Sequence, residues 1–284
     1  MKKRWKIFWI VCAVLAAAGL LLTAAGAALG GLSALRNAGK QNQVTWSDFE
    51  RTDPDDYVVG GPDGREILLY DLVEEIDLNL GGLRVCAMPG DVDGVLVDTS
   101  YLREDIRETV EDSIVCEDGG RELKIDVGKR LRGWNRNDTG TLYILYTSQK
   151  PFDSFSAELS AGSLELYSVW AEEISLSVGA GQILAEYFDA EHLETECGAG
   201  RIELQNGCIR KEAEIDCKLG RILVTLAFPT VQSDYNYELS WGAGEIMVGN
   251  GSYSGLFREA EIDNGSSRQI KADCGLGSIE IRFE

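Results

Sequence analysis

Apolar and polar residues alternate along most of the chain after Glu74, and the alternation returns in the same form several times. A period of two is typical of β-strands with one buried face. Seven segments align without gaps and share a glycine at the same offset: Gly81, Gly162, Gly181, Gly200, Gly220, Gly244 and Gly277. Differences of 19, 19 and 20 residues between the second and fifth of these glycines set the basic period, and the longer intervals indicate insertions.

Each repeat unit is expected to be two short strands joined by a tight bend. In the segment 193–204, Thr195 and Cys197 share one face while Glu194 and Glu196 share the other. The alternation breaks at the aligned glycine and then resumes. Glycine suits such a bend because it tolerates positive φ and lets two backbones approach closely.

Stacked copies of this unit predict an all-β fold, specifically a parallel β-solenoid with turns of about 19–20 residues. One unit cannot bury its apolar side alone, whereas parallel copies about 4.8 Å apart can. The alternative is an antiparallel meander or sandwich, which would not naturally repeat one residue class at one offset from the same glycine. We expect residues 276–283 to close the C-terminal end of the stack and residues 253–267 to loop outward.

The stretch between the first and second units is less regular. Segments 92–97, 123–127 and 140–146 have the composition of strands, and the last is expected to be buried. After Ser100, apolar residues recur at every fourth position, which predicts a short amphipathic helix with Ser100 as its N-cap.

The N-terminal segment predicts a membrane anchor, because residues 1–6 are basic and residues 7–32 contain no charge. This run exceeds the roughly 20 apolar residues that cross a bilayer and the roughly 7–15 of a cleavable signal peptide. The flanking cations predict a single-pass protein of the cell membrane with a cytoplasmic N-terminus and an extracytoplasmic body. Cleavage near residues 24–28 is the alternative. The expected parts are a basic tip and transmembrane anchor over 1–32, a tether and lead-in over 33–73, and the β-solenoid domain over 74–284.

The charge of the chain limits its partners. It has 27 Lys plus Arg against 47 Asp plus Glu, a formal charge of −20, and its first acidic residue is Asp48. Such a body repels phosphate backbones, so no nucleic-acid partner is expected. The acids recur at outward strand positions, which favours a cationic protein, peptide or other surface ligand. Membrane contact is expected through the N-terminal helix.

Seven cysteines are present, and Cys197, Cys217 and Cys274 occupy the same inward position of different units. The first interpretation is that they are small buried packing residues. Because Cys197 and Cys217 lie in consecutive units, one strand spacing should separate their Cα atoms, inside the window of about 4.4–6.8 Å for a disulfide. A Cys197–Cys217 disulfide is therefore the alternative, and Cys86 with Cys116 is a second candidate pair. No Cys-x-x-Cys spacing indicates a zinc or redox site.

No pattern predicts a catalytic residue, a cofactor or a metal site. The single histidine, His192, has no nucleophile placed to pair with it. The acidic segment 53–56 and the pair Asp91 and Asp93 match no calcium-binding spacing and are expected to be solvated. The glycine-rich bends lead into strands and carry no Gly-Lys-Ser/Thr, so no nucleotide-binding loop is predicted.

Three tryptophans in the body have different expected environments. Trp241 replaces a small inward residue of its unit and should fill the core. Trp134 and Trp170 are candidates for exposed aromatic contacts.

Several stretches together resemble the bacterial putative adhesin family. They are EEIDLNLGGLRVCAMPGDVDGVLVD, the strand GTLYILY, the segment KPFDSFSAELSAGSLEL and the recurring GAGxI units. The resemblance covers residues 74–283 and rests on structural glycines and alternating strands. It implies a membrane-anchored envelope protein with a repetitive β domain, and it supplies no catalytic residue.

We therefore expect a non-enzymatic interaction scaffold or adhesin-like module. One alternative is an envelope-stress or signalling accessory that regulates a membrane partner. A lesser alternative is a carbohydrate-active enzyme built on a solenoid, for which glycan turnover would depend on one or two carboxylates.

Overall fold

The structure is a computed structural model that describes residue 59 and residues 67–128 and 139–284. All of these residues belong to the unit Pro54–Glu284. The predicted transmembrane anchor and most of the tether lie outside the described residues, as does Trp134. Within the described residues, no helix is long and apolar enough to cross a bilayer.

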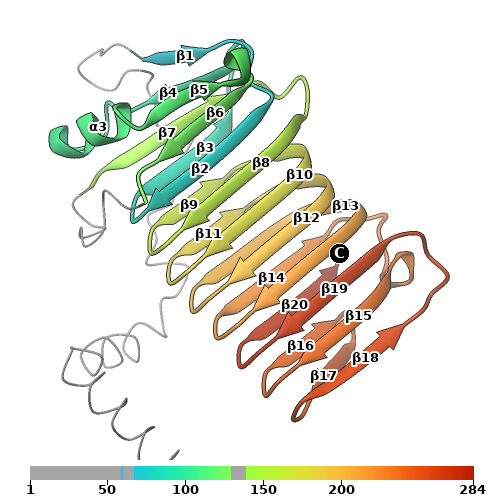
Figure 1. Cartoon of the computed structure of the whole chain (residues 1–284). Helices are drawn as coiled ribbons and strands as arrows, with labels where there is room; N and C mark the ends of the chain where they lie inside the picture. The colour runs from blue at the N-terminus through green and yellow to red at the C-terminus, as the bar shows by residue number, and fades with distance from the viewer. Residues whose placement is uncertain (1–58, 60–66, 129–138) are drawn as a thin grey trace, which may run out of the picture. The chain divides into compact units, whose positions relative to one another are not determined.

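The described residues are mostly β, as the sequence predicts, and form two ladders of parallel strands (Figure 1). Ladder I contains, in spatial order, β6 (Glu122–Asp126), β2 (Glu75–Gly81), β8 (Phe152–Leu159), β10 (Val169–Val178), β12 (Phe188–Cys197), β13 (Arg201–Cys217), β19 (Gln269–Cys274) and β15 (Asn236–Trp241). Ladder II contains β7 (Thr141–Tyr146), β3 (Arg84–Pro89), β9 (Ser163–Leu166), β11 (Gln182–Ala185), the first part of β13, β14 (Arg221–Leu226), β20 (Ser278–Phe283) and β16 (Glu245–Val248). The long strand β13 therefore contributes to both ladders.

Both ladders end in strands that run antiparallel to their neighbours. In ladder I these are β5 (Ile114–Glu117) beside β6 and β18 (Arg258–Ile262) beside β15. In ladder II they are β4 (Val95–Asp98), followed by β1 (Leu68–Tyr70), and at the other end β17 (Gly251–Ser254). The repeat units themselves pair in parallel, so the antiparallel alternative describes only the ends.

Six of the seven units pair in the register that the sequence alignment predicts. Examples are the pairs Ile174 with Phe155, Ala213 with Leu193, and Tyr237 with Ile270. The same positions of the units therefore form continuous columns across the ladders.

The order of the units in space differs from their order in the chain. The C-terminal unit, β19 and β20, lies between β13/β14 and β15/β16, so residues 276–283 do not close the end of the stack. Residues 253–267 do not simply loop outward, because they complete β17 and contain β18, which cover the last parallel strands. The expectation for both segments was wrong, since the repeat pattern fixes which residues pair within a layer and says nothing about the order of layers. Strands that run back along the end of a sheet also occupy its free edge, a common protection against edge-to-edge association.

The first unit is also inserted and is shifted by two residues from the predicted alignment. β2 lies between β6 and β8, and β3 lies between β7 and β9. Arg84 pairs with Ser163, whereas the alignment, with Gly81 opposite Gly162, placed Gly82 opposite Ser163. A slip of two residues keeps every side chain on the same face, so the apolar pattern could not reveal it.

The core lies between the two ladders and is filled by alternate residues of both. Inward columns run across the layers, and the column next to the bend contains Leu159, Val178, Cys197, Cys217, Cys274 and Trp241. Trp241 is buried, as predicted. A second, smaller apolar cluster, which the alternation did not predict, contains Cys86, Met88, Leu96, Tyr143 and Leu145.

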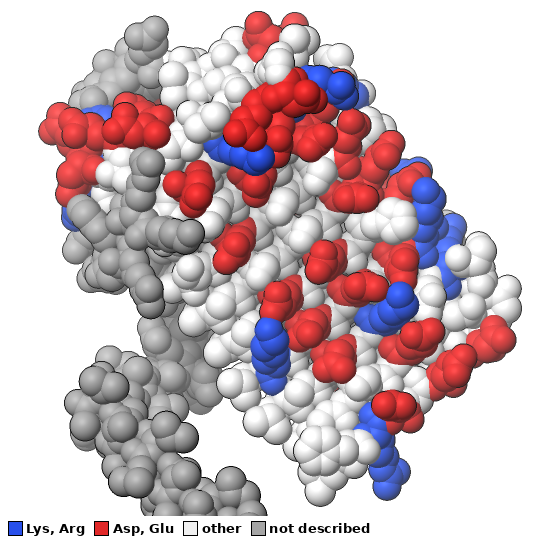
Figure 2. Space-filling view, in the orientation of Figure 1, with Lys and Arg blue, Asp and Glu red and all other residues white. Residues whose placement is uncertain are grey.

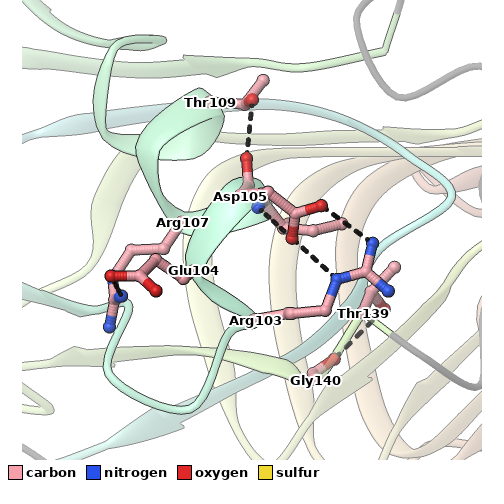
Figure 3. Close-up of polar contacts among 8 residues, drawn as sticks. Arg103, Glu104, Asp105, Arg107, Thr109, Thr139 and Gly140 are labelled. Carbon is pink, nitrogen blue, oxygen red and sulfur yellow. Dashed lines mark hydrogen bonds and ion pairs between the residues drawn. The ribbon is translucent and has the colours of Figure 1, made fainter.

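The irregular stretch contains the expected strands and helix, although the helix begins later than predicted. Helix α3 (Glu104–Glu111) follows β4 and buries Ile106 completely. Its N-cap is Arg103, and Asp105 accepts hydrogen bonds from the Ile106 backbone N–H at 3.1 Å and from Arg103 Nε at 2.7 Å (Figure 3). Ser100 instead belongs to the preceding turn, where its backbone N–H donates to Asp98. Short 3-10 helices occur at Asp118–Gly120 and Gln232–Asp234.

Candidate interaction surfaces

A column of glycines lines the bend where ladder I passes into ladder II. A Cβ atom on Gly181 would lie well under 3.0 Å from the Gly162 carbonyl oxygen, and one on Gly244 would lie 2.6 Å from that of Gly277. Real Cβ atoms essentially never come within 3.0 Å of another heavy atom in this way. The predicted repeat glycines in this column, in spatial order, are Gly162, Gly181, Gly200, Gly220, Gly277 and Gly244. Close approach of successive backbones therefore explains why glycine recurs there.

Positive φ is not the reason for the glycines of this column. Only Gly81, the predicted repeat glycine that lies out of register, has a left-handed conformation, with φ of 60°. The φ angles of the other six lie outside the left-handed range. Of the two reasons expected for glycine at the bend, close backbone approach therefore applies at these six positions and tolerance of positive φ does not.

The bend glycines also leave room for the cysteine column. Added Cβ atoms on Gly220, Gly277 and Gly244 would lie 2.5, 2.7 and 2.6 Å from the sulfurs of Cys197, Cys217 and Cys274, respectively. Each sulfur thus occupies the space above the bend of the next layer, and all three cysteines are buried.

Cys197, Cys217 and Cys274 are direct neighbours in register and are free thiols in the structure. A hydrogen bond from the Cys217 thiol lowers the pKa of Cys197 and raises that of Cys217. Burial, followed by the nearby Cys217, raises the pKa of Cys274 to about 11. The Cys197–Cys217 disulfide stays a prediction. The other candidate pair is divided between the ladders, with Cys86 on β3 and Cys116 on β5.

The outward side of ladder I carries rows of acids that are in register from strand to strand. One row contains Glu194, Glu214, Lys271, Glu238 and Glu261. The next contains Glu196, Asp216, Asp273, Ser240 and Glu259. Figure 2 shows Asp and Glu spread over one face of the molecule with few Lys and Arg among them. The C-terminal part of this face forms a shallow groove of about 720 Å³, and we call these two rows the acidic face.

Few cations offset the repulsion within the acidic face. Lys271 lies 2.6 Å from Glu212 and 3.1 Å from Glu214, and Lys218 pairs with Glu196. Burial, together with the charges of Asp273 and Glu196, raises the pKa of Asp216 against the opposing effect of Lys218. Like charges directly opposite each other in a sheet are destabilising. Neighbouring carboxylates of the acidic face therefore repel one another where no Lys lies between them.

The other candidate residues gather into no reactive site. His192 is exposed on ladder I and pairs in register with Glu173 and Glu212. Asp91 and Asp93 are exposed in the turn after β3. No group of His, Cys, Asp or Glu within residues 67–128 and 139–284 is arranged to hold a metal ion. The acidic segment 53–56 lies outside the described residues.

Comparison with known proteins gives matches only among solved structures. No protein family model and no curated protein matches the chain. A putative cell adhesion protein from Clostridium sporogenes is 14% identical with a TM-score of 0.41, covering 77% of this chain and 98% of its own. A putative adhesin from Parabacteroides distasonis is 14% identical with a TM-score of 0.39, and one from Bacteroides fragilis is 10% identical with a TM-score of 0.40. The alignment with each of these two covers 76% of this chain and 95% of the other.

Proposed function

We propose that this chain is a non-enzymatic interaction scaffold, an adhesin-like module held at the cell membrane by its N-terminal segment. The parallel ladders would be the turns of a β-solenoid of 19–20 residues per turn. The acidic face would bind a cationic partner, such as a basic segment of another protein. The uncharged segment 7–32 supports the membrane anchor.

The observation that carries this proposal is the register of the acidic face. Glu194 stands beside Glu214, and Glu196 stands beside Asp216, on strands that pair in parallel. Strand spacing of about 4.8 Å repeats these charges at a fixed interval. A partner with regularly spaced Lys or Arg would relieve the repulsion between neighbouring carboxylates, which favours binding without any covalent chemistry.

The test is binding of the full-length protein to an octalysine peptide, measured by fluorescence anisotropy. The variant carries Glu194→Gln, Glu214→Gln, Glu238→Gln and Glu261→Gln. The matched control removes four exposed acids elsewhere, through Asp91→Asn, Asp93→Asn, Glu104→Gln and Glu108→Gln. Both proteins have the same net charge.

We expect the acidic-face variant to bind octalysine at least about tenfold more weakly, while the control stays close to the unmodified protein. Binding of the unmodified protein should also weaken strongly between low and high salt, since screening shortens the range of exposed charges. Equal losses in the variant and the control would show that net charge alone governs binding and would refute the proposal.

A further inference from the structure

A second surface lies at the corner where ladder II passes back into ladder I, on the opposite side from the glycine bend. It is a groove of about 270 Å³ formed by successive repeat units. Its lining includes Trp170, Tyr187, Asp189, Asn206, Cys208 and Phe228. The sequence singled out Trp170, but the repeat pattern did not predict the companions that the fold brings to it.

Exposed aromatic rings are concentrated at this groove. Trp170 is 42% exposed, Tyr187 is 54% exposed and Phe228 is 84% exposed. In the part of the chain that the structure describes, the other strongly exposed aromatic side chain is Phe257, which is 85% exposed and lies at the end of the stack. Exposed apolar side chains that cluster, unlike single ones, mark interaction sites.

The groove has a buried floor. The Phe188 ring lies beneath it at 3% exposure, and a Cβ atom on Gly207 would collide with this ring. Glycine at 207 therefore lets the corner fold over Phe188. The Asn206 side-chain amide donates to the Glu186 carbonyl at 3.1 Å, which ties adjacent corners together.

Asp189, which lines the groove, is neutralised by Arg210 on the neighbouring strand. Arg210 Nε and its second guanidinium nitrogen lie 2.7 and 2.6 Å from the two carboxylate oxygens of Asp189. A two-bond pair of this kind fixes both side chains in one plane. It presents oriented donors and acceptors without a net charge, unlike the acidic face.

Several backbone groups at the groove are already paired with neighbouring strands. Trp170, Asp189 and Cys208 pair with one another across the parallel strands of ladder I. In the corner itself, the Val169 N–H donates to the Tyr187 carbonyl at 3.0 Å, and the Ala227 N–H donates to the Gly207 carbonyl at 2.9 Å. These paired groups are not available for strand addition, which needs unpaired backbone, so the groove offers a ligand ring faces and polar side chains instead.

We propose that this corner groove binds a neutral oligosaccharide. The C–H faces of sugar rings stack on aromatic side chains, and their hydroxyl groups can bond to the Asp189–Arg210 pair. A neutral chain also avoids repulsion by a protein of charge −20. The volume lies near the lower limit of about 300–1,000 Å³ for ligand pockets, so about one or two sugar units contact the groove at a time.

Cys208 provides a local readout, because it lines the groove and is partly exposed. The full-length protein is alkylated with and without maltohexaose, cellohexaose, laminarihexaose or chitohexaose, and each cysteine is followed by peptide mass spectrometry. The exposed Cys116 on β5 is the control thiol in the same sample. We expect at least one sugar to slow alkylation of Cys208 about tenfold at saturation and to leave Cys116 unchanged.

Two groove variants and two controls assign the effect to the groove. Trp170→Ala and Phe228→Ala should weaken the protecting sugar at least about tenfold, whereas Phe257→Ala, an equally exposed phenylalanine elsewhere, should not. The acidic-face variant should retain sugar binding, so this test can fail independently of the proposed function. No protection of Cys208 by any of the four sugars, protection that persists in Trp170→Ala and Phe228→Ala, or protection by octalysine in place of a sugar would each overturn the proposal.

Discussion

Replacing Gly181 by alanine tests how tightly successive bends are packed. The new Cβ atom would lie well under 3.0 Å from the carbonyl oxygen of Gly162, with the Ala161 carbonyl carbon at 2.9 Å and the Gly162 nitrogen at 3.0 Å. All three atoms belong to the backbone, so no side chain can rotate away to make room. The two bends must separate until the contact approaches the ordinary 3.4 Å.

The size of the effect follows from two contributions. Overpacking of a well-packed site costs about 1–3 kcal/mol. The separation also strains the hydrogen bond from the Gln182 N–H to the Gly162 carbonyl, at 3.1 Å, and a lost bond costs about 0.5–1.5 kcal/mol. We therefore expect Gly181→Ala to lower the free energy of unfolding by about 2–4 kcal/mol.

Gly82→Ala is the matched control, because a Cβ atom there meets nothing within 4 Å and the backbone is not left-handed. It should be neutral or slightly stabilising, since alanine reduces the freedom of the unfolded chain. Urea unfolding followed by circular dichroism measures both variants against the unmodified protein. If Gly181→Ala and Gly82→Ala had the same stability, close backbone approach would not be the reason for the glycine column.

Three further predictions concern the column of cysteines, the acidic face and the core. Diamide takes two electrons and two protons from a pair of thiols, and peptide mapping after its use should show a Cys197–Cys217 or a Cys217–Cys274 disulfide. Formation of a Cys197–Cys274 disulfide in the Cys217→Ser variant would contradict the register. An acid whose pKa is raised in the folded state lowers the stability of the protein above that pKa and has no such effect below its unfolded pKa of about 3.9. The Asp216→Asn variant should therefore unfold at a higher temperature than the unmodified protein at pH 7. An unchanged gain in unfolding temperature at about pH 3 would refute the electrostatic cause. Thr195→Val should raise the free energy of unfolding by about 1 kcal/mol, because the buried Thr195 hydroxyl has no hydrogen-bond partner among the described residues. A loss of stability in urea unfolding would show that this hydroxyl does make a hydrogen bond.

The repeat pattern predicted the interior of the fold well, because alternation and the bend glycines are local properties. The positions that share a column, such as Cys197 and Cys217, follow directly from a period of 19–20 residues. Their neighbour Cys274 could not be placed, since the sequence does not state which layer the last unit enters. The energy that selects this order comes from long-range packing.

The surfaces were predictable in chemistry but not in arrangement. The outward acids were visible as alternating Glu and Asp, but Lys271 reaches Glu214 only because β19 is inserted beside β13. Trp170 was identifiable as an exposed ring, whereas Phe228 joins it from a unit much later in the chain. The groove depends on how the corners between strands fold, which the alternation within the strands does not describe.

The stacking order is tested most directly by disulfide cross-linking of cysteines placed on the outward side of ladder I. One protein carries Glu214→Cys with Lys271→Cys, and the other carries Glu214→Cys with Glu238→Cys. In the structure, 214 and 271 are neighbours, and 238 lies beyond 271. We predict that mild oxidation links 214 to 271 and leaves 214 and 238 unlinked, because two strand spacings of about 4.8 Å exceed the disulfide window. Efficient linkage of 214 to 238, with none to 271, would show that the units stack in chain order and would contradict the account.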